Sequence, residues 1–299
     1  MPPRRNIWFD LQDETLAAPA VSIIGLPFDG STSLKAGAAA APEKLRAISR
    51  TSDPVTRRGK VITGLTLRDF GDVAARDAAG RALPQGDYLS SARERIERAM
   101  GGRLTIVLGG DNSVSIPALQ AFTRCHGPST GIVWFDAHPD LFEAYDGNPD
   151  SHACALRRAM VLCGTDPGQV VLLGTRSFSA GEARFIQDQR IEMVTAADCR
   201  ACPPETVASR IARRLKGLSA VYLAIDIDGF DASCAPGTGY PMPGGPGAEV
   251  FFAILEKLFE KLPIRAMDIT EIAPPLDTND LTGFLGVQVV LESLGALPA

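Results

Sequence analysis

Two short acidic motifs place carboxylates and a histidine at spacings suited to binding a metal ion. Asp136, His138 and Asp140 form the pattern D-x-H-x-D, and Asp226 and Asp228 repeat the two-residue spacing later in the chain. In an extended segment, residues two apart point to the same side, so the members of each motif can converge. Aspartates after strands often only cap helices or form turns, but clustered carboxylates repel one another unless cations neutralise them. Both motifs together favour a metal site, and one imidazole among oxygen ligands suits Mn²⁺.

Short apolar runs alternate with amphipathic segments along the chain. The amphipathic segments, such as 87–100, 205–218 and 248–262, carry apolar residues at helical spacing. The pattern predicts an α/β fold of three layers, α/β/α, around a central, mostly parallel sheet of about eight strands. Seven apolar runs are expected to form strands, at residues 19–30, 104–111, 131–138, 169–176, 191–198, 220–228 and 264–272.

Length, composition and charge limit the other possibilities. No linker divides the 299 residues, so residues 1–299 are expected to form a single domain. A net charge of -5 supplies no basic patch for nucleic acid, and a small cationic substrate fits it better. The segment MPPRRNIWFDLQDE lacks the apolar core of a signal peptide, and no apolar run approaches the ~18 residues of a membrane span. We therefore expect a cytoplasmic protein with no membrane or nucleic-acid partner, whose six scattered cysteines are reduced.

Polar clusters follow four of the expected strands. They are GGDNS (109–113), DAHPD (136–140), DIDGFD (226–231) and the TEI that follows RAMDI (270–272). In parallel sheets ligands gather beyond the carboxyl ends of the strands, so one shared site is expected there.

Taken in order, these motifs resemble those of the ureohydrolases, the arginases and agmatinases, from about residue 20 to about residue 290. GGDNS is similar to the family's GGDHS, WFDAHPD to its DAHxD motif, and AIDIDGFDASCAPGTGYPMPGG to its long signature. DITEIAPPLDTNDLTG is similar to the segment that carries the family's substrate glutamate. SHACALRRAM (151–160) and DAHPDL are closer to the agmatinase branch. The resemblance implies an arginase-like fold and a homo-oligomer, a trimer or hexamer.

The resemblance also implies a centre of two Mn²⁺ ions. Asp136 and Asp226 would bridge the ions, His138 and Asp228 would complete one of them, and Asp140 would help to hold the other. A hydroxide between the ions would attack the guanidinium carbon of the substrate.

Four further residues are assigned to the reaction or to the substrate. The resemblance implies that His152 acts as a proton shuttle, that Glu271 pairs with the guanidinium and that Asp231 supplies another carboxylate. Asp146, in the acidic loop LFEAYDGNPD (141–150), suits a cationic amine tail, although a solvated acidic loop explains it equally well.

Asn112 departs from the family pattern, because it stands where the family has a metal-binding histidine. Its amide oxygen can coordinate a hard cation but binds borderline metals less well than imidazole. The ion held by Asn112 and Asp140 is therefore expected to be the weaker of the two.

The expected reaction is hydrolysis of agmatine to putrescine and urea, a step of polyamine biosynthesis. The alternatives are another guanidino or amidino substrate (guanidinobutyrate, guanidinopropionate, arginine or formiminoglutamate) and a catalytically silent subunit weakened at Asn112. Deacetylation has less support, because it typically uses adjacent histidines and none of the three histidines adjoins another.

Overall fold

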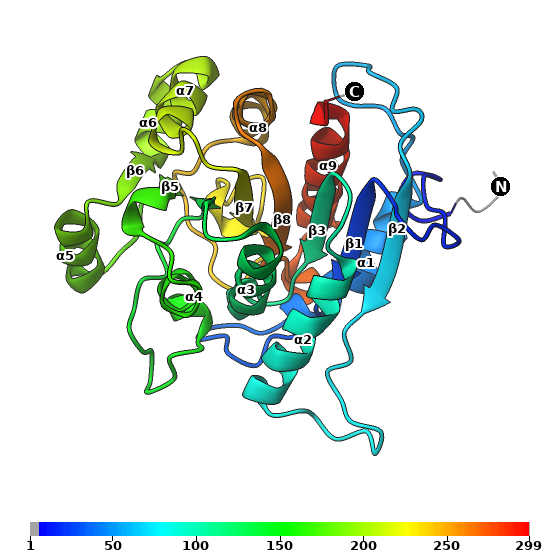
Figure 1. The fold of residues 1–299 in the computed structure, drawn as a ribbon, viewed down its shortest axis with the longest axis horizontal. Helices are drawn as coiled ribbons and strands as arrows, with labels where there is room; N and C mark the ends of the chain where they lie inside the picture. Colours follow the sequence, from blue (N-terminus) through cyan, green and yellow to red (C-terminus); the bar gives the residue numbers. More distant parts are fainter. Residues whose placement is uncertain (1–5, 299) are drawn as a thin grey trace.

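Eight parallel strands form one central sheet in the computed structural model, which describes residues 6–298 (Figure 1). Every neighbouring pair is parallel, which confirms the predicted fold class. Across the sheet the order is β2 (Leu67–Asp72), β1 (Val21–Gly25), β3 (Leu104–Leu108), β8 (Ile264–Thr270), β7 (Ala220–Asp226), β4 (Thr130–Phe135), β5 (Val170–Thr175) and β6 (Glu192–Thr195).

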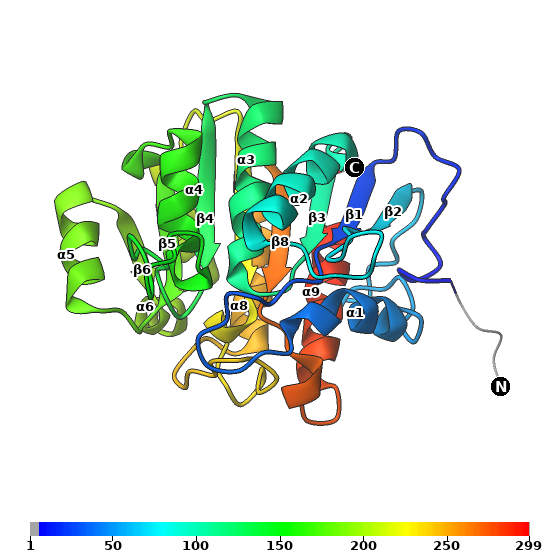
Figure 2. The same cartoon turned by 90° about the horizontal axis from the view of Figure 1, so that it is seen from below.

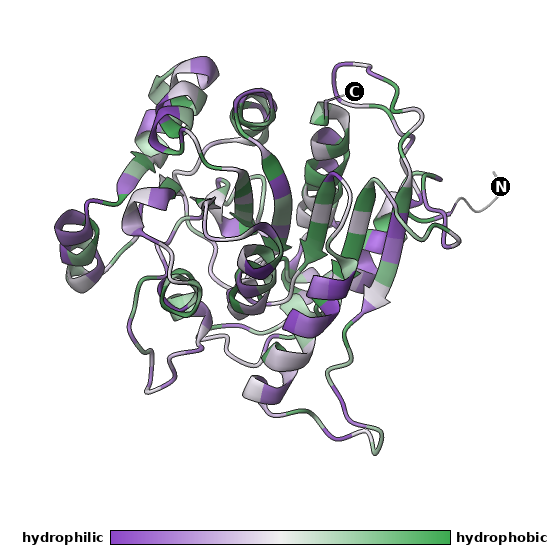
Figure 3. Ribbon diagram, viewed as in Figure 1, coloured by the Kyte–Doolittle hydropathy of each residue, from purple (hydrophilic) through white to green (hydrophobic). Residues whose placement is uncertain are grey.

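Two helical layers cover the two faces of the sheet, and each encloses its own apolar core. Successive strand residues point to opposite faces, so Ile106 of β3 lies in one core and Val107 in the other. Figures 1 and 2 show the sheet between these layers, and Figure 3 shows that its central strands are mainly hydrophobic. One layer contains α2 (Gln85–Ala99), α3 (Ser115–His126), α4 (Ala155–Cys163) and α5 (Ala180–Gln189); the other contains α1 (Ala41–Ser49), α6 (Ala196–Ala201), α7 (Pro204–Arg214), α8 (Ala248–Lys261) and α9 (Leu281–Ala296).

The edge strand β2 was absent from the runs expected to form strands. Its sequence, LRDFGD, contains no continuous apolar run, and only Leu67 of this strand is buried. Its polar side chains are instead held by α1, where Arg46 pairs with Asp69 at 2.7 Å and with Asp72 at 2.5 Å. An edge strand needs less apolar sequence than a central one, which is why hydrophobicity alone missed it.

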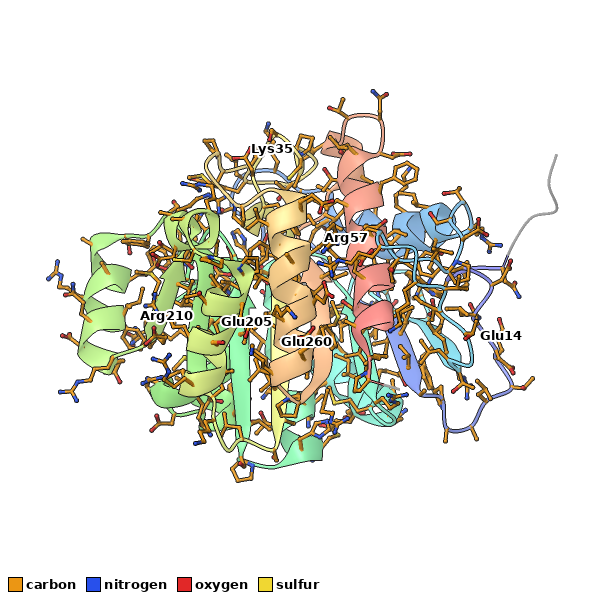
Figure 4. All side chains as sticks on the ribbon, turned by 90° about the horizontal axis from the view of Figure 1, so that it is seen from above. Glu14, Lys35, Arg57, Glu205, Arg210 and Glu260 are labelled. Atoms are coloured by element: carbon orange, nitrogen blue, oxygen red, sulfur yellow. The ribbon has the colours of Figure 1, made fainter. Side chains whose placement is uncertain are left out.

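Charged side chains lie on the outer helical faces and on loops. Figure 4 shows Glu205 and Glu260 on α7 and α8, and Lys35 among the loops at the carboxyl ends of the strands. Arg57 connects its loop to α8 and α9 through ion pairs with Glu249, Glu256 and Glu292. Among residues 6–298, no helix has both the length and the apolar character to cross a membrane. The first five residues of the segment MPPRRNIWFDLQDE, which was expected not to be a signal peptide, lie outside the described residues.

Candidate metal centre and active site

A cavity of about 260 Å³ opens at the carboxyl ends of the central strands. Loops that are distant in sequence meet around it, as the segments after β1, β4 and β7 gather below the sheet in Figure 2. The side chains predicted for chemistry that line it are His138, Asp140, His152, Asp226, Asp228 and Glu271.

Asp136, His138 and Asp228 form a group with the geometry of a metal site. Nδ1 of His138 lies 3.2 Å from Oδ2 of Asp228 and 3.5 Å from Oδ1 of Asp136, and one potential ligand atom from each residue lies within 4.8 Å of the others. Asp136 follows β4 directly and Asp228 follows β7, so the parallel pairing of these strands brings the two motifs together. Imidazole and carboxylate oxygens are a donor set that a first-row divalent cation accepts.

The electrostatics of this group call for positive charge. Burial, and then Asp228, raise the pKa of Asp136 to about 7. Burial opposes the charged form of His138, but Asp228 and Asp136 raise the pKa of His138 to about 12. A bound cation would supply the compensation that the proton on His138 otherwise supplies, so the residues present fit a divalent ion.

Asp140 and Asp226 complete the acidic cluster. Burial, followed by neighbouring carboxylates, raises the pKa of both residues well above the usual aspartate range. Asp226 also accepts the backbone N–H of Asp228 at 2.8 Å. Asp140 has a φ of 49°, in the left-handed region that costs energy for a residue other than glycine. The two motifs are therefore brought to one edge of the sheet as the sequence indicated.

Asn112 is buried beside this cluster and uses its whole amide in hydrogen bonds. Its Nδ2 donates to Oδ2 of Asp140 at 2.7 Å and to Oδ2 of Asp136 at 3.0 Å. Its Oδ1 accepts from the hydroxyl of Thr270 at 3.0 Å and lies 3.2 Å from the hydroxyl of Ser115, which also donates to Asp268 at 2.7 Å. In this orientation the NH₂ group, rather than the oxygen expected to coordinate an ion, faces the carboxylates.

His152 and Glu271 lie together on the other side of the cavity. Nδ1 of His152 is 3.3 Å from Oε1 of Glu271, and the same oxygen accepts the backbone N–H of Asn112 at 2.9 Å. Burial opposes protonation, but the hydrogen bond and charge of Glu271 raise the pKa of His152. Glu271, like Asp140, holds a left-handed backbone conformation, with φ at 62°. The two residues predicted to be catalytic are thus directly paired.

Sequence reasoning missed the residues that fix His152 from the opposite side. Nε2 of His152 accepts the backbone N–H of Ser33 at 3.1 Å and lies 2.9 Å from the Ser33 hydroxyl. The backbone N–H of His152 donates to Ser31, whose own N–H and hydroxyl donate to the buried Asp111. Asp111, the acidic residue of GGDNS, could have indicated these contacts, because a fully buried aspartate needs several hydrogen-bond donors.

Asp231 and Asp146 are not brought to the cavity. Asp231 accepts hydrogen bonds from Ser233 and from the backbone of Gly244, which closes its own loop. Asp146 is exposed at a left-handed turn position, with φ at 48°. Neither is among the described residues that line the cavity.

The loop after β7 is held from behind by Arg176. Its guanidinium donates at 2.7–3.1 Å to backbone carbonyl oxygens at both ends of this loop and to that of Gly174. The loop carbonyls belong to Asp228, Gly229, Phe230, Met242 and Pro243. The segment that carries Asp228 and Tyr240 to the cavity is therefore anchored through its backbone.

An α/β/α fold with a histidine and carboxylates at the carboxyl edge of a parallel sheet is the arrangement of a metal-dependent hydrolase. The model of the arginase family matches residues 19–295. The chain belongs to the arginase family, and the resemblance seen in its motifs is confirmed.

Known proteins similar to this chain share most of its length. It is 31% identical to a guanidinobutyrase of Pseudomonas aeruginosa, over 95% of this chain and 88% of that protein. It is 32% identical to an N(1)-aminopropylagmatine ureohydrolase of Thermococcus kodakarensis, over 92% of this chain and 90% of that protein. Among solved structures, proclavaminate amidino hydrolase from Streptomyces clavuligerus matches with a TM-score of 0.88 and 26% identity, over 97% of this chain and 96% of that one.

Proposed function

We propose that this chain hydrolyses a linear guanidino compound to urea and an amine, that its substrate is agmatine, and that its metal is Mn²⁺. The observation that carries the proposal is the cavity itself, where the histidine and carboxylates of the metal site face the pair His152–Glu271. The relatives named above, a guanidinobutyrase and an aminopropylagmatine ureohydrolase, support the same class of substrate.

Glu271 is suited to hold the guanidinium group of the substrate. Its side chain is 6% exposed, and Asn112 and His152 both bond to Oε1, which fixes the carboxylate in place. A carboxylate matches the planar fork of a guanidinium and can accept two parallel N–H bonds. In a buried site this pairing orients the guanidinium carbon toward the acidic cluster.

A guanidinium is a poor electrophile, so its hydrolysis requires an activated nucleophile. A divalent ion bound at Asp136, His138 and Asp228 would activate water at neutral pH, since coordination lowers the pKa of water to about 7. The protein's own contribution is to exclude bulk water and to hold the guanidinium beside that position.

His152 is placed to move the proton that the departing amine requires. Glu271 favours the protonated imidazole, whereas the N–H of Ser33 favours an unprotonated Nε2. The Ser33 hydroxyl at 2.9 Å accommodates either state, because it can donate to or accept from Nε2. His152 is therefore poised to donate a proton to a leaving nitrogen and to be reprotonated.

The cavity favours a cationic over a carboxylate tail on the substrate. None of the described residues that line it is a lysine or an arginine, so a tail carboxylate would find no cationic partner there. Aromatic side chains line it instead, and their faces attract ammonium groups. They are Phe142, Tyr145, Phe178 and Tyr240. These features favour agmatine over guanidinobutyrate, guanidinopropionate, formiminoglutamate and arginine.

The test is urea release by Mn²⁺-loaded protein with agmatine, guanidinobutyrate, guanidinopropionate and arginine, and ammonia or formamide release with formiminoglutamate. Asp136→Ala serves as the blank. Agmatine is expected to show the highest kcat/KM, and the blank to show no turnover. Preference for a carboxylate-tailed compound would refute the substrate while leaving the ureohydrolase class intact. No turnover of any compound would favour the silent-subunit alternative.

We further propose that the chain acts as a single domain over residues 1–299, in the cytoplasm and in polyamine biosynthesis, as a homo-oligomer of three or six copies. The absence of a basic patch in the sequence composition argues against a nucleic-acid partner. Size-exclusion chromatography with light scattering measures the oligomeric state directly.

A further inference from the structure

Asn112 distinguishes the two sides of the acidic cluster. Where a second metal ion would need a ligand, the chain presents an amide whose NH₂ group bonds directly to Asp136 and Asp140. A neutral donor thus occupies the space between carboxylates that a cation would otherwise neutralise. On the side formed by Asp136, His138 and Asp228, the imidazole lies between the two carboxylates, and Trp134 donates to Asp136 at 3.1 Å.

The orientation of the Asn112 amide is set by the two carboxylates in front of it, because the hydroxyls behind it can donate to an oxygen or accept from an NH₂ group. The hydroxyls of Thr270 and Ser115 are 3.0 Å and 3.2 Å from Oδ1. Turning the amide over would place Oδ1 at the positions now held by Nδ2, 2.7 Å from one carboxylate oxygen and 3.0 Å from another. Those contacts repel unless a cation lies between them.

The backbone of Asn112 ties this orientation to the substrate site. Its N–H donates to Oε1 of Glu271, so its main chain and side chain each hold a carboxylate. Asn112 is 2% exposed and begins a short 3-10 turn, which leaves the residue little freedom to swing away.

We infer that this chain binds one divalent ion, at Asp136, His138 and Asp228, and that the Asn112 amide takes the position of the second ion. This goes beyond the loosely held second ion that the sequence indicated. Asp140 then serves as a hydrogen-bond partner of the amide and not as a metal ligand. A single ion suffices to activate water, so the inference is compatible with hydrolysis.

The experiment is metal counting on the full-length protein, stripped with a chelator and then loaded with Mn²⁺. Bound Mn²⁺ per chain is measured by elemental analysis after removal of free metal, and electron paramagnetic resonance reports whether neighbouring ions are magnetically coupled. The wild type is expected to bind one uncoupled ion. Asn112→His restores an imidazole and is expected to double the count to two, with a coupled signal.

Three further variants test separately the metal site at His138 and the opposite side of the acidic cluster, at Asn112 and Asp140. His138→Ala is expected to reduce the count from one to zero, and Asp140→Asn to leave it at one. Asn112→Asp, close in shape to the wild type, is expected to raise it to two and covers the case in which the histidine variant does not fold.

Two coupled ions in the wild type, no bound ion, or loss of the single ion in Asp140→Asn would each overturn the inference. Because urea release is not measured, failure of the proposed substrate and failure of this inference are separate results.

Discussion

The two sides of the acidic cluster solve the same electrostatic problem in different ways. On one side His138 stands between Asp136 and Asp228 at 3.2–3.5 Å, and its pKa of about 12 reflects their combined charge. On the other side Asn112 donates to Asp136 and Asp140 at 2.7–3.0 Å without carrying a charge. The first side can exchange its proton for a metal ion. The second already has its hydrogen bonds, so it gains less from a cation.

The largest expected effect is that of removing His138 from the metal side of the cluster, compared with removing Asp140 from the Asn112 side. His138→Ala should reduce kcat/KM by on the order of 10³-fold, because a metal supplies several kcal/mol of charge stabilisation and each 1.4 kcal/mol is tenfold. Asp140→Ala should cost ~10–100-fold, the range for groups that orient a metal ligand, because Asp140 holds the Asn112 amide that bonds to Asp136. Urea release measures both, with His126→Ala on the exposed end of α3 as the control. Equal losses would mean that both sides hold metal.

A second prediction concerns the stability of the metal-free protein. Asn112→Leu preserves approximate size but removes both donors from Asp136 and Asp140. Asp136 keeps the hydrogen bond from Trp134 at 3.1 Å, but Oδ2 of Asp140 loses its donor, which should lower the free energy of unfolding by about 2 kcal/mol. Urea denaturation in excess chelator measures the difference. A change below ~0.5 kcal/mol, the usual effect of a surface substitution, would show that the amide does not stabilise the carboxylates.

The third prediction concerns the pair formed by His152 and Glu271. Glu271→Gln keeps the shape but removes the charge that raises the pKa of His152, so that pKa should fall. Nuclear magnetic resonance of labelled histidine can follow this, because the sequence has only three histidines to assign. An unchanged pKa would mean that Glu271 does not control the imidazole.

The pair of His152 and Glu271 also makes the stability of the fold depend on pH in a defined direction. Since the folded pKa of His152 is raised above its unfolded value of about 6.5, the pair stabilises the fold fully below that pH. The stabilisation is lost as the pH rises through the raised folded pKa. The stability difference between wild type and Glu271→Gln should therefore narrow with increasing pH, and a widening difference would contradict this assignment.

The smallest expected effect tests the hydroxyls behind Asn112. Thr270→Val removes the donor 3.0 Å from Oδ1 without a large change in shape and should cost about 1 kcal/mol of stability. Thr278→Val, at an exposed position, is the matched control and should change stability by less than ~0.5 kcal/mol. If both variants behave alike, the Thr270 hydroxyl does not stabilise the Asn112 amide.

The central part of the fold could be predicted because its strands are apolar throughout. Strands such as β3 and β4 are buried at every residue, so continuous hydrophobicity identified them. The strand β2 pairs with β1 at the edge of the sheet, and its aspartates form ion pairs with Arg46 of α1. No local pattern in residues 67–72 contains that information.

For the site, residues that belong to one motif could be assigned from their spacing, but their hydrogen-bond partners from distant loops could not. The pattern D-x-H-x-D, together with the similar spacing of Asp226 and Asp228, predicted a metal site that includes His138. The Asn112 amide bonds to Asp136 and Asp140 on one side and to Thr270, 158 residues away, on the other. Ser33 reaches His152 across 119 residues. Asp231 and Asp146 were assigned from motif and loop charge, but in the structure they lie outside the lining of the cavity.

Arg176 holds the loop after β7 by its carbonyl oxygens, at Asp228 on one side of the loop and at Met242 and Pro243 on the other. Backbone carbonyls are the same for every amino acid, so an exposed side chain between these points can be exchanged without disturbing the anchor, whereas buried residues such as Phe230 cannot. Tyr240 lies in that stretch and lines the cavity. A chain built in this way can acquire a new preference for the far end of its substrate through substitutions near Tyr240, while Asp228 keeps its place at the chemical centre.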